Sequence, residues 1–592
     1  MVFQICRNLA DFQEKRNPRW APRVALIGFV FLDSSSLFLQ IPRLASRFMW
    51  LKNLVFLLLA TLVLASVAQW LLLPDRPPDA VRTITPPGRG FDAALQEVNR
   101  QFAAAWRARD LTPAPAADDL TVARRLSLGL TGTIPSLEEI RLLEARSTED
   151  RLTWWVDHLL HDRRYGDYMA ERLARAYVGT EGGPFLLFRK RRFLTWLSDE
   201  LMAGRPYDQL VQELIAESGL WTDHPAVNFI TATIDADGTQ EPDVVKLAGR
   251  TTRAFLATRI DCVECHDDNL GGDLKQSDFH ELASFFRDAR NSFVGITDRL
   301  GTPYDYQYLG AAETVTVPAK VPFNEHLLDQ PTGTLRQQLA AWVTHPRNKP
   351  FARATVNRVW AIMTGRPLVQ PVDDIPLAGS FRDGTYPPGL EPLADDFIAS
   401  GFDLRRLIHL IAASDAFRRD SKADHEITAR HEEYWAAFPV SRLRPEQVIG
   451  SINQAASLQT INADSHILTR LVTFGETSDF LKRYGDAGED EFSLDSGTIP
   501  QRLMMMNGNL VKERTEENFI RNAATKIAQL SPTDPAAIET AFLCVLTRRP
   551  TKAEASHFVA LIRDPDRTTR RQQDLEDIFW ALMNCTEFAW NH

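Results

Sequence analysis

Residues 123–139 have the sequence ARRLSLGLTGTIPSLEE, which predicts two consecutive helices separated by a short turn. Apolar residues recur at helical spacing up to Leu130, and Gly132 is the residue type that most often ends a helix. Ser136 then begins the second helix, because Glu139 stands three residues later, as in a capping box. The pattern favours an architecture of helices joined by short turns.

The same helical spacing of apolar residues recurs along most of the chain. Strand signals are sparse, and only residues 228–234 and 313–317 alternate or carry β-branched side chains. The chain is therefore predicted to be mainly α: a multi-helical two-domain body with a small irregular or β-containing insert, after one N-terminal transmembrane or signal helix. Further helices are predicted at 150–160, 165–177, 188–202, 207–217, 334–344, 350–364, 390–400 and 404–414, and from 445 onward.

Changes in composition divide the chain into six segments. The predicted segments are a basic cytoplasmic stretch at 1–53, an apolar helix at 54–73, a Pro-rich linker at 74–90, a helical domain at 91–290, the insert at 291–331 and a second helical domain at 332–592.

Residues 54–73 contain no charged side chain and are long enough to cross a bilayer as a helix. Residues 1–53 carry eight Lys or Arg and three Asp or Glu, a balance of +5, so the net charge of −10 leaves −15 for the remainder. The positive-inside rule places the N-terminus in the cytoplasm and the body in the periplasm or outside the cell. The acidic body argues against a nucleic-acid partner.

Two features near this segment leave its processing open. Ser66-Val67-Ala68 resembles a signal-peptidase site, so the segment is either a retained anchor or a cleaved signal. Met49 is an alternative start, and translation from it would remove Cys6.

The most concentrated group of reactive side chains lies at residues 261–268, DCVECHDD. Cys262, Cys265 and His266 have the Cys-x-x-Cys-His spacing of c-type haem attachment, in which two thiols reach the haem vinyl groups and the imidazole binds the iron. Two other interpretations stay open. One is a local disulfide, which an oxidising compartment favours, and the other is a metal clip with a fourth ligand. The candidates for that ligand are His280, Asp267, Asp268 and Asp273.

A haem at this site is not expected to have methionine as the second axial ligand of its iron. The sequence has no Met between His266 and Met363. The distal position is therefore expected to be open or filled by a histidine, of which His280 and His326 are the nearest downstream.

Ordered motifs across residues 91–592 resemble those of one known family. The matching segments are RRLSLGLTGTIPSLEE at 124–139, the Cys-x-x-Cys-His motif, DFHELASFF at 278–286, NKPFARATVNRVW at 348–360, GRPLV at 365–369, VDD at 372–374, TIPQRLMMMN at 498–507, RRPTKAE at 548–554 and WALMNCTEF at 580–588. The chain resembles the planctomycete-type secreted cytochrome-like proteins that join a DUF1549 domain (planctomycete cytochrome domain 2) to a DUF1553 domain (planctomycete domain 1). Residues 91–290 would form the first domain and 332–592 the second.

The resemblance implies thioether positions at Cys262 and Cys265 and an axial ligand at His266, but no established reaction. Relatives usually have a second histidine two residues after the first, whereas this chain has Asp268 there. A metal site that used this second histidine would be altered in this protein.

Several other residues suit chemistry but have simpler interpretations. Asp373 and Asp374 suit acid–base work, yet the sequence favours a solvated turn bridged to Arg353 and Arg358. Three histidines that lie alone in or beside predicted helices are typical of structural or solvated side chains: His345, His409 and His557. Cys544 and Cys585 are either buried thiols or a second disulfide.

The sequence thus predicts an exported cytochrome-like protein that binds haem c at Cys262, Cys265 and His266 and transfers electrons. A metal other than haem iron would use His266 and His280. Its expected partners are the membrane, through the N-terminal helix, and a redox or secreted protein. The alternative is a non-redox surface scaffold or binding protein with a structural disulfide or metal clip. Enzymatic activity stays open: a hydrolase is a third candidate, although no Ser-His-Asp elbow, phosphate-binding glycine loop or His-Glu-x-x-His pattern occurs.

Overall fold

The computed structural model divides into two units, Met1–Thr83 and Ile84–His592. It describes residues 54, 57, 58, 61, 88–179, 188–234, 240–268, 274–328, 332–377, 386–462, 492, 503–506, 509–518, 522–563 and 570–592. None of the helices formed by these residues is both long enough and apolar enough to span a bilayer. Most of the predicted membrane segment, 54–73, lies outside the described residues, as do Cys6 and Met49.

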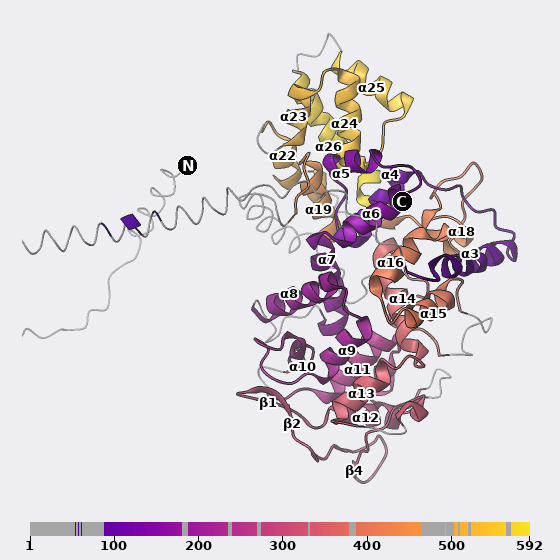
Figure 1. Cartoon of the computed structure of the whole chain (residues 1–592), viewed down its shortest axis with the longest axis vertical. Coiled ribbons are helices and arrows are strands. Elements are labelled where there is room, and N and C mark those ends of the chain that lie inside the picture. The colour runs from indigo at the N-terminus through magenta and orange to yellow at the C-terminus, as the bar shows by residue number, and fades with distance from the viewer. Residues whose placement is uncertain are drawn as a thin grey trace, which may run out of the picture. The chain divides into compact units, whose positions relative to one another are not determined.

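The described body is mainly helical, as predicted (Figure 1). The 123–139 pattern forms α4 (Asp119–Thr131) and α5 (Leu137–Glu144). Gly132 ends α4 with a φ of 69°, and Ser136 and Glu139 form the predicted capping box. The other helices of this half are α3 (Phe91–Arg107), α6 (Arg151–Leu160), α7 (Arg163–Val178), α8 (Phe188–Ala203), α9 (Tyr207–Ala216), α10 (Asn228–Thr231), α11 (Val244–Leu256) and α12 (Gln276–Ala283).

The predicted strand signal at 228–234 is wrong. Residues Asn228–Thr231 form α10, and the side-chain Nδ2 of Asn228 donates to the Pro225 carbonyl at 2.8 Å. Phe229 and Ile230 are fully buried, so the β-branched and aromatic side chains that suggested a strand belong to a helical turn inside the core.

The predicted β-containing insert is present. Strands β1 (Ala289–Ser292) and β2 (Gly295–Asp298) form one antiparallel hairpin. Strands β3 (Asp305–Tyr306) and β4 (Val315–Thr316) form another, followed by the 3₁₀ helix η4 (Glu325–Leu328). The β1–β2 hairpin contacts the helical body at Gly219, which exchanges backbone hydrogen bonds with Ile296 of β2 at 2.8 and 2.9 Å.

Helices resume after the insert. They are α13 (Leu335–Val343), α14 (Lys349–Thr364), α15 (Leu390–Ala399), α16 (Leu404–Ala413), α17 (Asp415–Arg418), α18 (Ala429–Glu433), α19 (Pro445–Ala455), α22 (Asn509–Thr515), α23 (Ala523–Leu530), α24 (Asp534–Leu546), α25 (Lys552–Ile562) and α26 (Arg571–Met583). A short pair that the sequence did not predict, β5 (Ser441–Arg442) with β6 (Trp590–Asn591), joins the last residues to the segment directly before α19.

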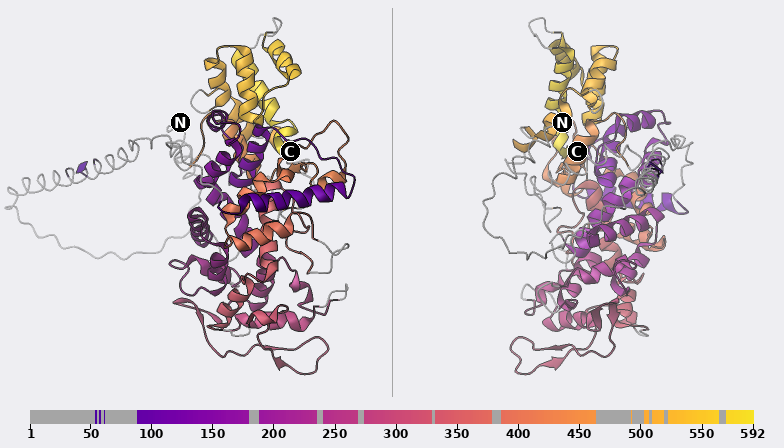
Figure 2. Two further views of the ribbon diagram at one scale, coloured as in Figure 1. Left: turned by 45° about the vertical axis from the view of Figure 1, so that its right-hand side comes forward. Right: turned by 90° about the vertical axis from the view of Figure 1, so that its left-hand side faces the viewer.

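Helices from both halves of the body share one hydrophobic core, which contains residues from Val98 to Phe492. One close approach within this core joins α4 to α14, where a Cβ on Gly129 would lie 2.8 Å from the Met363 backbone. A second core forms among α19 and α22–α26 and takes in Leu128 and Ile134 from the N-terminal half. In both views of Figure 2 the early helices accordingly run among the later ones. The predicted domain boundaries remain a prediction.

Candidate functional site

The Cys-x-x-Cys-His motif begins in the 3₁₀ helix η2 (Ile260–Val263), which follows α11. Ile260 and Val263 are buried and hold this turn against the core. Cys262 and Cys265 are exposed, and so is His266. The turn therefore fixes the backbone while it presents both thiols and the imidazole to solvent.

His266 has a defined hydrogen-bonding state. Its Nδ1 lies 2.7 Å from the Asp267 carbonyl oxygen. Because a carbonyl only accepts, Nδ1 carries a proton, and in the neutral form of the ring Nε2 carries the lone pair. Protein ligands of metals commonly hold their second ring nitrogen in this way, and Nε2 has no partner within the described part of the chain.

His280, on α12, supports the motif from beneath. Its side chain is 1% exposed, and its ring stacks on Tyr306 with centroids 3.5 Å apart. Nε2 donates to the Glu264 carbonyl at 3.0 Å, and Nδ1 lies 2.8 Å from the Tyr304 hydroxyl. Burial lowers the pKa of His280, which favours the neutral ring.

These contacts decide what His280 does in this arrangement. Both ring nitrogens are engaged, and the Gln276 amide donates to the same Glu264 carbonyl at 3.0 Å. A role for His280 as a metal or iron ligand stays a prediction, and it would require one of the two hydrogen bonds of the ring to break.

The described ranges contain no group of three or more His, Cys, Asp and Glu side chains placed to hold a metal ion. Asp273, one of the suggested fourth ligands, lies outside those ranges. The four described cysteines are free thiols, with Cys544 buried and Cys585 partly buried. Burial raises the pKa of Cys544 to about 12, which leaves this thiol protonated and unreactive.

Ion pairs bind the N-terminal side of the motif to the second half of the chain. Arg253 on α11 forms a two-point pair with Asp261, the residue directly before Cys262, and also lies 3.6 Å from an Asp373 oxygen. Arg259 donates to Asp373 at 2.7 and 3.1 Å. Asp374 is half-buried, and burial raises the pKa of its carboxyl.

The sequence-based prediction that Asp373 lies in a turn bridged to arginines is confirmed, but the predicted arginines are wrong. Asp373 lies in a turn bridged to arginines, but these are Arg253 and Arg259 rather than Arg353 and Arg358. Arg353 pairs instead with Glu391 at 2.5 Å. The two arginines that bridge to Asp373 lie more than 100 residues upstream, so no local pattern indicated them.

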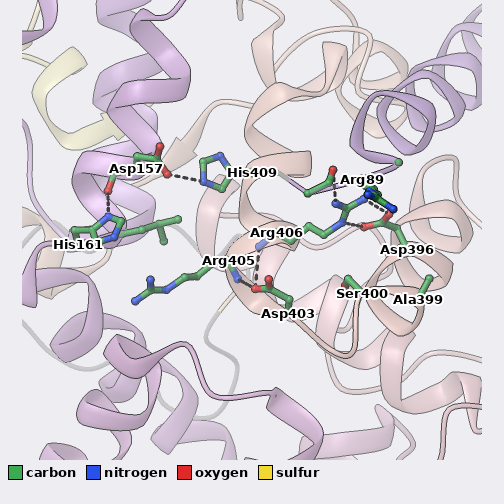
Figure 3. Close-up of a pocket in the computed structure, with 13 residues that line it drawn as sticks. Arg89, Asp157, His161, Asp396, Ala399, Ser400, Asp403, Arg405, Arg406 and His409 are labelled. Carbon is green, nitrogen blue, oxygen red and sulfur yellow. Dashed lines mark hydrogen bonds and ion pairs between the residues drawn. The ribbon is translucent and has the colours of Figure 1, made fainter. Parts of the chain in front are cut away.

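A second group of polar side chains lines a pocket of about 530 Å³ (Figure 3). Asp157 in the last turn of α6 accepts from His409 on α16, with Nε2 and Oδ1 3.1 Å apart. His409 is therefore a paired histidine, as its interpretation as a structural side chain required. Sequence reasoning missed the pocket itself, because Asp157 lies 252 residues from His409 and nothing in either helix indicates the pairing.

The fold and the first site define a class: a largely helical protein with an exposed Cys-x-x-Cys-His turn tied by ion pairs to a second helical region. Residues 97–291 match PSCyt2, described as a protein of unknown function (DUF1549), and residues 335–471 match PSD1, described as a protein of unknown function (DUF1553). The chain belongs to the planctomycete-type family that joins these two domains. No curated protein and no solved structure gives a significant match. Cys262 and Asp373 lie in the first and second matched regions, so the ion pairs around Arg253 connect the two domains.

Proposed function

We propose that this chain is an exported cytochrome-like protein that binds haem c at Cys262 and Cys265, with His266 as the axial ligand, and transfers electrons. The observation that carries the proposal is the state of His266, whose Nδ1–H is held by the Asp267 carbonyl while Nε2 is left with its lone pair. The two exposed thiols flank the same turn. When bound, the haem would supply one-electron transfer.

The surrounding residues have positioning roles in this proposal. Arg253 holds Asp261 at one end of the turn, while His280 and Gln276 hold the Glu264 carbonyl near the other. Fixing the backbone at both points keeps the thiols and the imidazole in one arrangement at the surface, where a redox or secreted protein partner can approach.

Export is the second part of the proposal. It rests on the uncharged residues 54–73 and the +5 balance before them, which support an anchor or signal helix with the body in the periplasm or secreted. The membrane is then a partner of the N-terminal helix. An oxidising compartment is also where c-type attachment would compete with a disulfide at the same cysteines.

A non-redox scaffold is the second candidate function, favoured by the ion pairs that use this turn to join the two domains. In that case a Cys262–Cys265 disulfide or a metal clip would stiffen the junction. It would leave His266 without an iron-binding role.

Haem staining of the full-length protein on a denaturing gel separates the two functions, with expression in a host that has c-type maturation. We expect a covalent haem signal and a pyridine haemochrome spectrum for the wild type, and loss of both in Cys262→Ser. Cys585→Ser is the matched control and should keep the signal. A colourless wild-type protein with a Cys262–Cys265 disulfide in its mass spectrum would refute electron transfer and support the scaffold.

A further inference from the structure

The pocket beside Asp157 is built from both matched domains and is separate from the Cys-x-x-Cys-His turn. Asp157 and His161 come from α6 and the residue after it, while Arg405 and His409 come from α16. Its volume of about 530 Å³ lies in the range of pockets that hold small molecules. Such pockets form preferentially where domains meet.

Asp157 orients two imidazoles at this pocket. Its carboxylate accepts from Nε2–H of His409, so in the neutral form of that ring Nδ1 carries the lone pair. Its backbone carbonyl lies 2.7 Å from Nδ1 of His161, which must donate, so in the neutral form of this second ring Nε2 carries the lone pair. Neither lone pair has a partner within the described residues. Each is therefore available to accept a hydrogen bond from a ligand hydroxyl.

The charges around the pocket are unevenly neutralised. Asp396 is taken up by Arg406 in a two-point pair at 2.8 and 2.9 Å. The Asp403 side chain accepts from two backbone N–H groups at the start of α16, at 2.9 and 3.1 Å. Figure 3 shows both carboxylates turned toward these partners.

Arg405 lines the pocket but forms no ion pair with a carboxylate among the described residues. Its Nη2 donates to the Met202 carbonyl at 2.5 Å, and its Nε is buried without a hydrogen-bond partner. Arg89, on the opposite side of the pocket in Figure 3, is exposed. Neither arginine has a carboxylate partner among the described residues. A guanidinium without a carboxylate favours an oxyanion from outside the chain.

We propose that this pocket binds a small hydroxylated anion, such as a sugar acid. Its carboxylate would pair with Arg405, and its hydroxyl groups would donate to His409 and His161. The chemistry distinguishes this ligand from a simple anion, which offers no donors to the imidazoles, and from a neutral sugar, which offers no charge to Arg405. The proposal is independent of haem binding.

Calorimetric titration of the full-length protein in detergent tests the proposal with three probes: glucuronate, glucose and acetate. We expect glucuronate to bind more tightly than either of the others, because only glucuronate has both the charge and the donors. Arg405→Gln should weaken glucuronate binding at least about tenfold and leave glucose unchanged. His409→Gln should weaken glucuronate and glucose alike.

Two variants keep the result interpretable. Arg107→Gln changes an exposed arginine on α3 that does not line the pocket and should bind glucuronate as the wild type does. Arg405→Lys keeps the charge without the planar fork and should retain part of the affinity. The proposal is overturned if glucuronate does not bind at about 10 mM, if acetate binds as tightly as glucuronate, or if Arg405→Gln behaves like Arg107→Gln.

Discussion

Asp373 accepts two hydrogen bonds from Arg259, at 2.7 and 3.1 Å, across 114 residues of sequence. The same carboxylate lies 3.6 Å from Arg253, which holds Asp261 beside Cys262. One carboxylate of the DUF1553 domain thus contacts both arginines beside the turn that carries the exposed thiols of the DUF1549 domain.

Asp373→Asn should loosen this junction. The amide keeps the shape of the side chain but loses the charge that faces two arginines, and we expect a loss of about 1 kcal/mol in the free energy of unfolding. Asp395→Asn, at an exposed carboxylate that pairs with Lys349 at 2.8 Å, is the control and should change it by less than about 0.5 kcal/mol. Urea unfolding measures both, and equal effects would contradict a special role for Asp373.

His280→Ala should release the backbone of the Cys-x-x-Cys-His turn. The substitution removes the donor to the Glu264 carbonyl and the stack on Tyr306. Hydrogen exchange of residues 260–266 is therefore expected to quicken, while His326→Ala, at an exposed position of η4, should leave exchange there unchanged. Unchanged exchange in His280→Ala would show that the turn is held by other contacts.

The same histidine predicts a pH dependence. Burial lowers the pKa of His280 in the folded protein below its unfolded value of 6.5. The unfolded chain then binds a proton more readily, so the stabilisation by neutral His280 is complete above about pH 6.5 and is lost as the pH falls through the lower, folded value. Wild-type stability should decline over this interval more steeply than that of His280→Ala. Parallel curves would contradict the assignment.

Glu139 predicts a second, more acidic transition. Burial by itself would raise the pKa of this capping-box carboxyl, but Arg164, His158 and the Ser136 N–H together lower it to about 2, below the ordinary 4.5. Its stabilisation is therefore complete above pH 4.5 and lost as the pH falls toward 2. Glu139→Gln should cost about 3 kcal/mol at pH 7 and progressively less below pH 4.5, measured by urea unfolding across this range. If the stability difference between the wild type and Glu139→Gln did not change with pH, the lowered pKa of Glu139 would be refuted.

The insert is attached where two backbones come unusually close. Gly295 has a φ of 96°, and a Cβ there would lie 2.0 Å from the Gly219 carbonyl oxygen. Gly295→Ala should therefore detach the β1–β2 hairpin and cost about 3 kcal/mol. Gly301→Ala is the matched control, because its φ is 79° but a Cβ there meets nothing within 4 Å, and only about 1 kcal/mol of backbone strain is expected. Thermal unfolding compares the stability of the two variants. Equal losses of stability would mean that backbone strain accounts for the effect at Gly295 and that the contact with Gly219 adds nothing.

The parts of the fold that could be predicted from sequence are those with local causes. Gly132 and the Ser136–Glu139 capping box fixed the boundary between α4 and α5 within a few residues. The pair of β5 with β6, the partners of Asp373 and the contact of Asp157 with His409 could not be predicted, because each joins side chains or backbones that only tertiary packing brings together. The spacing of Cys262 and Cys265 was enough to identify them as candidate site residues. The hydrogen bond from His280 to the Glu264 carbonyl could be found only in the structure.

Gly129 offers a test of whether the two matched domains unfold together. A Cβ at this position would lie 2.8 Å from both the Cα and the carbonyl oxygen of Met363, so Gly129→Ala forces α4 and α14 apart. Because these helices share one hydrophobic core, we expect a loss of about 2 kcal/mol and a simultaneous loss of hydrogen-exchange protection in both domains. Protection lost only within residues 97–291 would instead show that the DUF1553 region is stable without the contact between α4 and α14.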